Sequence, residues 1–256
     1  MGFELDYPRC QMPKSFIDAI AAQRLLRDLE ATASATLPRV VADARDHLWL
    51  LERIGTADVT GDLHFQRQLC RHAGMRGKLR MRREDLFLIL DEFRLKPSRT
   101  YPDLLMAISG LTGQVEKSVA SEILALLEPD QPTIDREVRE LLPRYGFYPL
   151  PESPLFDECV AYHRQLRAAM MLVVQTPAYE RLEARFDAAL GPSSASLSRL
   201  RKLNLQLSGS YRTVALMPSL EPVRRGIPRH VGVSHPVPAA LPQIIARPGV
   251  RLHLCR

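Results

Sequence analysis

The residues of this chain whose types and spacing could do chemistry gather between Ile108 and Val138. Gly113 lies between two segments of helical character, and a glycine turn of this kind leaves backbone N–H groups open at a helix N-terminus, where a phosphate binds readily. Asp135 follows Pro132 and opens a third helical segment. A carboxylate at a helix start stays ionised and can stabilise positive charge that develops beside it. The sequence therefore predicts a phosphate site with an acid nearby.

The stretch Leu111–Val138 resembles the helix-hairpin-helix DNA glycosylase superfamily and, within it, short uncharacterised bacterial members. The likeness rests on Leu-x-Gly, then Ala-Ser-x-Ile-Leu from Ala120, a proline, and Asp-x-x-Val from Asp135. It extends more weakly over residues 80–190. The resemblance implies an all-α multi-helix bundle with a DNA-facing cleft between two helical lobes. It also implies chemistry on a base flipped out of the duplex, and no cofactor.

By this resemblance Asp135 is the catalytic acid, and Lys117, which lies 18 residues before it, is a candidate Schiff-base nucleophile. If the family pattern is instead aligned at Ala120, Ser118 takes the position of the nucleophile and Lys117 does not. Each residue also has a plainer interpretation. Asp135 can cap a helix together with Thr133, and a lysine at a helix start usually faces solvent. Both interpretations stay open at this point.

The resemblance assigns the phosphate grip to four residues of the turn: Gly113, Gln114, Val115 and Ser118. The chain departs from the family pattern at two points. Val115 stands where a second glycine is expected, and the interval from Leu111 to Ala120 is one residue longer. A β-branched residue resists the positive φ that glycine adopts freely, so the turn must be rebuilt. The other interpretation is a plain connection between two helices.

A basic stretch offers a second set of DNA contacts. Between Phe65 and the arginine at position 83 there are seven basic residues and no acid. These residues are Arg67, Arg71, Arg76, Lys78, Arg80, Arg82 and Arg83. Such a set neutralises phosphates and makes binding steeply salt-dependent. The alternative is a solvated face whose charge is balanced by the acids that follow, Glu84, Asp85, Asp91 and Glu92.

The overall charge of +6 says little about the body of the chain. Residues 209–256 contain seven arginines and one glutamate, so residues 1–208 are formally neutral. Hydrophobic and charged fractions of 46% and 25% are those of an ordinary soluble protein. No apolar run approaches the ~20 residues that cross a bilayer. The N-terminus lacks the features of a secretory signal, so we expect a cytoplasmic protein. We also expect a monomer that binds double-stranded DNA and does not bind a membrane.

The four cysteines, Cys10, Cys70, Cys159 and Cys255, are widely separated and have no close histidine partners. This spacing matches neither a zinc site nor the cysteine loop of an iron–sulfur cluster. We therefore expect free thiols, no metal and no cofactor.

Helical periodicity dominates the elements that must position these residues. The spacing predicts helices over residues 15–29, 39–54, 62–72, 84–93, 103–108, 116–127, 134–142, 156–174, 178–190 and 196–207. Pro38 is expected at the first turn of the second of these helices. Without any convincing alternating run, the sequence predicts an all-α body over residues 1–208 with a glycosylase-like core at 80–190. Many prolines and no period predict a disordered tail over residues 209–256.

The sequence as a whole predicts a DNA-binding protein related to the glycosylases of base-excision repair. On this interpretation it hydrolyses the N-glycosidic bond of a flipped base, as a monofunctional enzyme. Two other classes stay open. One is a non-catalytic DNA-binding module of the same fold, and the other is a helical interaction protein in which every motif serves packing. Fold alone does not decide among them.

Overall fold

The computed structural model describes residues 18–75 and 82–215, all of which belong to the unit Met1–Pro222. Within these ranges every regular element is a helix, which confirms the all-α prediction. The helices are α1 (Ala19–Ile54), α2 (Leu63–His72), α3 (Arg83–Leu95), α4 (Tyr101–Thr112), α5 (Lys117–Leu127), α6 (Arg136–Leu141), η1 (Leu142–Tyr145), α7 (Phe156–Val174), α8 (Pro177–Leu190), η2 (Pro192–Ser196) and α9 (Arg199–Ala215). Among the helices described, none has the length and apolar character that a bilayer crossing requires.

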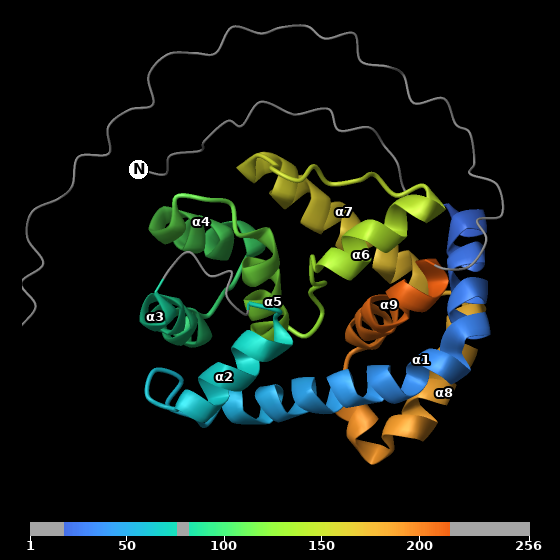
Figure 1. Ribbon diagram of the computed structural model, residues 1–256, viewed down its shortest axis with the longest axis horizontal. Coiled ribbons are helices and arrows are strands. Elements are labelled where there is room, and N and C mark those ends of the chain that lie inside the picture. The colour runs from blue at the N-terminus through green and yellow to red at the C-terminus, as the bar shows by residue number, and fades with distance from the viewer. Residues whose placement is uncertain (1–17, 76–81, 216–256) are drawn as a thin grey trace, which may run out of the picture. The chain divides into compact units, whose positions relative to one another are not determined.

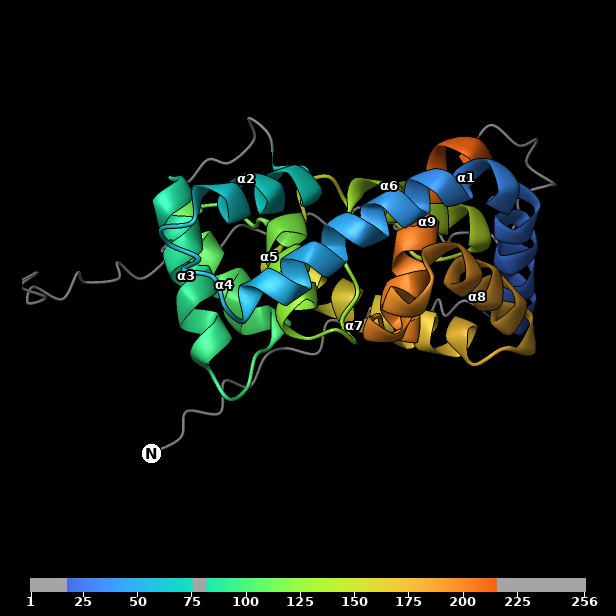
Figure 2. The ribbon, with the colours of Figure 1, turned by 90° about the horizontal axis from the view of Figure 1, so that it is seen from below.

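Helix α1 is one element of 36 residues where the sequence predicted two. Asp18 caps its start, because its Oδ1 accepts a hydrogen bond of 2.8 Å from the Ala21 N–H. Pro38 lies inside the helix, not at a first turn, and α1 bends along its length (Figures 1 and 2). Proline lacks an N–H and its ring presses on the preceding turn, so it bends a helix that packing holds together. The prediction was wrong because Ala33 and Val40, on the two sides of Pro38, are both buried.

The remaining helices lie in two groups along α1. Helices α2 to α5 lie beside one end of α1, and α6 to α9 lie beside the other (Figures 1 and 2). The hairpin of α4 and α5 belongs to the first group, whereas the helix that follows Asp135 belongs to the second. The loop between α5 and α6 therefore joins the two groups, and Asp135 lies at that junction.

Helix α9 is the central element of the second group, where α1, α6, α7 and α8 pack around it (Figure 1). All residues from 201 to 207 are buried. The sequence predicted that this helix ends at residue 207, but it continues to Ala215. A Cβ on Gly209 would overlap the side chain of Val40, so glycine lets α9 approach α1 closely. Tertiary packing thus overrides the low helix propensity of residues 208–210, and the predicted tail from residue 209 begins with helix.

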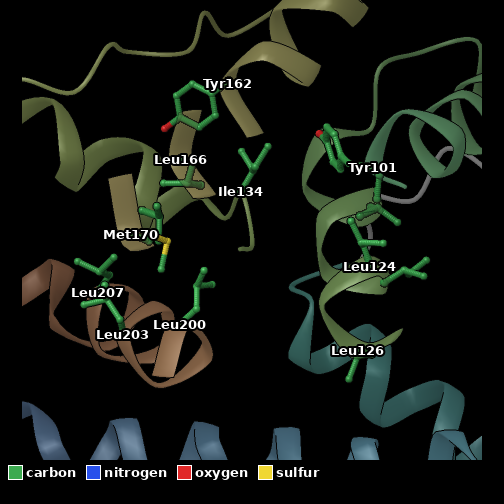
Figure 3. Packing of buried hydrophobic residues seen from close by; sticks show 14 of the residues in the cluster. Tyr101, Leu124, Leu126, Ile134, Tyr162, Leu166, Met170, Leu200, Leu203 and Leu207 are labelled. Atoms are coloured by element: carbon green, nitrogen blue, oxygen red, sulfur yellow. The ribbon is translucent and has the colours of Figure 1, made fainter. Parts of the chain in front are cut away.

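Buried apolar side chains from both groups form one continuous cluster. Figure 3 shows part of it, where Met170 reaches from α7 toward Leu200 and Leu207 of α9. On the other side of the same view, Leu124 of α5 lies among the side chains of the first group. This cluster fixes α5 and α9, the two helices that carry most of the polar residues considered below. The predicted disorder of residues 216–256 lies outside the described residues.

Candidate nucleic-acid interface

The turn between α4 and α5 is built on Gly113. This glycine caps the C-terminus of α4 with a φ of 67°, in the left-handed region that glycine adopts without strain. Thr112 closes the turn, because its Oγ1 accepts from the Gln114 N–H at 3.1 Å and donates to the Gln114 carbonyl at 2.9 Å. Gly113 and Gln114 are exposed. The turn thus presents its backbone outward, although the Gln114 amide is already bonded.

Val115 and Glu116 lead from the turn into α5. Val115 is partly buried against the hydrophobic cluster, and its carbonyl accepts from the Lys117 N–H at 3.0 Å. Glu116 is the N-cap residue of α5 and has a φ of −84°, so the positive φ of this turn lies at Gly113. The Glu116 side chain makes no capping hydrogen bond. Beyond the Lys117 N–H, the first N–H groups of α5 are therefore not occupied by a side-chain cap, which leaves them open to an anion.

Lys117 begins α5 but is held by the protein itself. Its Nζ donates to the Glu152 carbonyl at 3.1 Å, and its own carbonyl accepts from the Tyr101 hydroxyl at 3.2 Å. Partial burial, and then the nearby Arg139 guanidinium, lower the pKa of the Lys117 amine. That direction suits a nucleophilic amine. No hydrogen bond or ion pair joins Lys117 to Asp135 in the described parts of the chain.

The start of α5 does hold the backbone next to Asp135. Ser118 Oγ donates to the Ile134 carbonyl at 2.7 Å, and the Ile134 N–H donates to Ser121 Oγ at 2.8 Å. The structure therefore brings Ser118 and the residue before Asp135 together, as the predicted neighbourhood of turn and acid requires. The Ser118 hydroxyl is used in this internal bond.

The Asp135 carboxylate caps α6, which confirms the capping interpretation. Its Oδ1 accepts from the Val138 N–H at 2.6 Å. Its Oδ2 accepts from the Ser208 hydroxyl, and Thr133 Oγ1 lies 3.3 Å away. Burial raises the pKa of this partly exposed carboxyl to about 6, against the opposing effect of the Ser208 hydrogen bond. The side chain is thus committed to donors of the protein itself.

Part of the basic stretch is paired with acids. Arg71 forms an ion pair of 3.1 Å with Asp46, and Arg82 one of 3.0 Å with Asp85. The second pair is the charge balance that the alternative interpretation of this stretch proposed. Such exposed pairs contribute little to stability, but they reduce the charge that is available to a phosphate.

The rest of the basic stretch is exposed or lies outside the described residues. Arg67 and Arg83 are exposed, and neither has an ion pair within residues 18–75 and 82–215. The other three basic residues, Arg76, Lys78 and Arg80, lie outside the described residues. Figure 1 shows α2 and the α4–α5 turn at opposite ends of α5. The part of the basic stretch that lies on α2 is therefore not brought together with the turn.

A buried polar cluster around Arg201 lies where α1, α2, α5 and α9 meet. Arg201 is only 3% exposed, and its Nη2 lies 3.0 Å from His47 Nδ1 and 3.1 Å from His72 Nε2. Both nitrogens accept from the guanidinium, so both imidazoles are neutral. Burial, followed by the Arg201 charge, lowers the pKa of His72 to about 3. The Glu122 Oε2 lies 3.6 Å from the same Nη2.

Sequence reasoning missed this cluster, because its members come from four distant parts of the chain. One signal was present. Arg201, Asn204 and Ser208 recur at intervals of three and four residues, so in a helix they share one face. A basic residue between Leu200 and Leu203 can be buried together with them, and a buried cation requires partners from other helices.

The structure adds two facts about metals and thiols. Within the described residues, no group of three or more His, Cys, Asp or Glu side chains is arranged to hold a metal ion. Cys70 and Cys159 are buried free thiols. Cys10 and Cys255 lie outside the described residues.

Comparisons of the chain with protein-family models, with curated proteins and with solved structures find no match.

Proposed function

We propose that this protein binds duplex DNA through the α4–α5 turn, with a backbone phosphate at the N-terminus of α5. One observation carries the proposal. Helix α5 starts without a side-chain cap, directly behind the exposed pair Gly113 and Gln114. A helix of this length concentrates partial positive charge at its first N–H groups, and a phosphate oxygen fits there. Resemblance to the helix-hairpin-helix superfamily supports the same assignment.

Asp135 is a structural residue in this proposal. Its carboxylate accepts hydrogen bonds from the Val138 N–H of α6 and the Ser208 hydroxyl of α9, and it lies close to Thr133 Oγ1. A group that stabilises developing charge must already face the substrate before the reaction. The internal donors hold the carboxylate away from such a role, and they favour binding without chemistry.

Hydrolysis of an N-glycosidic bond is the second candidate function. It is favoured by the contact between Ser118 and Ile134, which holds the residue before Asp135 beside the start of α5. Asp135 is also partly exposed. A substrate bound at the turn would then lie close to an acid.

Binding is tested by fluorescence anisotropy of a labelled duplex at several salt concentrations. Gly113→Ala strains the left-handed turn and adds a methyl group where phosphate approaches, so we expect affinity to fall by about tenfold. Gly110→Ala is the matched control, because Gly110 is an exposed helical residue with open space around its Cβ position. Equal affinities for the two variants would refute the proposal.

Chemistry is tested by base release from duplexes with deaminated, oxidised or alkylated bases. We expect no release from the wild-type protein. Release that disappears in Asp135→Asn while duplex affinity persists would instead establish the second candidate, since asparagine keeps the N-cap but removes the charge.

A further inference from the structure

A small hollow lies at the bend of α1, where α1, α8 and α9 meet (Figure 2). Leu37 and Val40, on the two sides of Pro38, form part of its wall together with Leu182 of α8. Its volume is about 10 Å³. One water molecule requires about 10–15 Å³ of internal space, whereas sites for organic ligands measure about 300 Å³ or more. The hollow therefore has the size of a site for a single water molecule.

Gln206 of α9 lines this hollow with a side-chain amide that has no protein partner. The residue is 5% exposed, and both its Oε1 and its Nε2 are buried without a hydrogen bond to any described residue. An amide that leaves water without gaining a new partner is costly in free energy. The group combines an acceptor oxygen with two N–H donors, so it can bind a water molecule in either orientation of the amide.

Two hydroxyl groups line the same hollow and already form a chain of hydrogen bonds. Ser210 Oγ of α9 donates to Thr36 Oγ1 of α1 at 3.3 Å, and Thr36 Oγ1 donates to the Thr32 carbonyl at 3.1 Å. The hydrogen of each hydroxyl is therefore used. The Ser210 oxygen still has lone pairs, and no donor within residues 18–75 and 82–215 makes a hydrogen bond to it.

Gln206 and Ser210 approach the hollow from successive turns of one helix. They are four residues apart on α9, so their side chains lie on the same face. A water molecule between them can donate one hydrogen to Ser210 Oγ and pair with the Gln206 amide through its other hydrogen or its oxygen. An internal water needs two to four polar partners, and these two residues supply that number.

We propose that the hollow is a binding site for one internal water molecule, held between the Gln206 amide and Ser210 Oγ. The water heads a chain that runs through Ser210 and Thr36 to the Thr32 carbonyl, in which each member donates to the next. Successive hydrogen bonds of this kind polarise and strengthen one another. The chain joins α9 to α1 next to the bend at Pro38. This water site is independent of the proposed DNA binding.

Arg185 of α8 gives the water a route to solvent. It lines the hollow and is itself exposed, and its Nη2 donates to Ser34 Oγ of α1 at 3.1 Å. Exposed side chains change rotamer rapidly. The bound water therefore exchanges with the bulk without unfolding of the protein, but it is held longer than water on the surface.

The test is an NMR measurement of dipolar transfer from water to the side-chain amide protons of the full-length protein, labelled with ¹⁵N at glutamine. Experiments in the laboratory and rotating frames together separate dipolar transfer from proton exchange, because the two differ in sign in the rotating frame. We expect the Gln206 amide protons to show the signs of transfer from a retained water molecule. The exposed Gln114 amide in the same sample is the reference for surface water.

Ser210→Ala removes one of the two partners of the water, so we expect the transfer to Gln206 to be lost. Ser208→Ala is the matched control, because it makes the same change on the same helix at a residue that does not line the hollow. In that variant the transfer to Gln206 should persist.

The proposal fails if Gln206 gives the same signs as Gln114, because the hollow then retains no water. It also fails if the transfer survives in Ser210→Ala, or if Ser208→Ala abolishes it equally. If Ser210→Ala does not fold, a high-resolution crystal structure of the wild-type protein decides. Density for a water molecule within hydrogen-bond distance of Ser210 Oγ and the Gln206 amide upholds the proposal, and a hollow without such density overturns it.

Discussion

Asp135 and Glu122 show how neighbouring acids take different roles from their surroundings. Asp135 is served by an amide and a hydroxyl at the start of α6, so its charged form is stabilised. Burial raises the pKa of Glu122 to about 7, and the nearby Arg201 charge opposes this shift. One carboxyl therefore caps a helix, whereas the other lies buried in the cluster around Arg201. The hydrogen-bond donors around each carboxyl decide its role more than the negative charge that both can carry.

Replacing Asp135 should reveal its capping role. Asp135→Ala removes the acceptor for the Val138 N–H and one acceptor of the Ser208 hydroxyl, so we expect a loss of about 1–2 kcal/mol of unfolding free energy. Asp135→Asn retains the capping oxygen and should lie within about 0.5 kcal/mol of the wild type. Urea unfolding at pH 7 measures both. Equal losses in the two variants would contradict the capping role.

His163 should make the protein less stable in acid. It is buried on α7, where it stacks on Tyr101 with ring centroids 4.1 Å apart, and burial lowers its pKa to about 4. The unfolded chain then binds more protons below pH 6.5, so this contribution to stability is present at pH 7 and is lost on acidification. From pH 7 to pH 5 we expect a loss of about 2 kcal/mol from this residue.

His163→Phe keeps a ring on Tyr101 and removes the titration. Urea unfolding at both pH values should show a fall for the wild type that exceeds the fall for the variant by that amount. His47 and His72 also have lowered pKa values, but they are common to both proteins. Parallel pH profiles for the two proteins would refute the assignment.

The sequence anticipated the local roles of single residues better than their partners. A Thr-x-Asp before a helical segment indicated an N-cap, and Asp135 is one. The left-handed turn at Gly113 also followed from a glycine between helices. The bond from Lys117 to Glu152 and the cluster around Arg201 join positions far apart in sequence. No local pattern encodes such contacts, because they depend on how the helices are placed.

At the scale of elements, the sequence predicted that the elements are helices but did not predict where every helix begins and ends. The spacing of apolar residues predicted the helices, but it also predicted a helix boundary at Pro38 and another before residues 208–210. Both are weak points of local propensity that buried faces on either side override. Helix α1 continues through its proline, and α9 continues through Gly209 because a small residue is required against Val40. A local helix breaker inside a packed face marks close contact there, not an end.

Gly209→Ala should therefore destabilise the protein even though alanine favours helix. The new methyl group would overlap Val40, so one of the two helices must shift, at a cost of about 1–3 kcal/mol. Adding Val40→Ala should recover part of that loss, which a double-mutant cycle measures. Gly110→Ala is the control, since its Cβ meets open space, and it should gain up to about 1 kcal/mol. Similar changes at both glycines would contradict the close approach of α1 and α9.

Across the whole molecule, charge and fold are distributed differently. The net charge of +6 comes entirely from residues 209–256, whereas residues 1–208 carry acids and bases in equal number. Within the helical part, Arg71 and Arg82 are paired with acids. Non-specific attraction to DNA and recognition by the α4–α5 turn should therefore arise from separate parts of the chain.

A chain that ends at Ala215 separates these two contributions. It lacks six arginines and one glutamate, so the salt dependence of duplex binding should become less steep. The roughly tenfold effect of Gly113→Ala should persist, because the turn is intact. Anisotropy titrations between low and moderate salt measure both quantities. If the shortened chain shows no difference between Gly113→Ala and the wild type, binding does not depend on the turn.

The position of α9 has a consequence for how the chain folds during synthesis. The helices that surround it, α1, α6, α7 and α8, all leave the ribosome before it does. The faces that pack on α9 lack this partner until residues 199–215 are made. Domains generally fold as units, and apolar surface exposed before completion is prone to aggregate. The second group of helices therefore completes its packing only after α9 has been made.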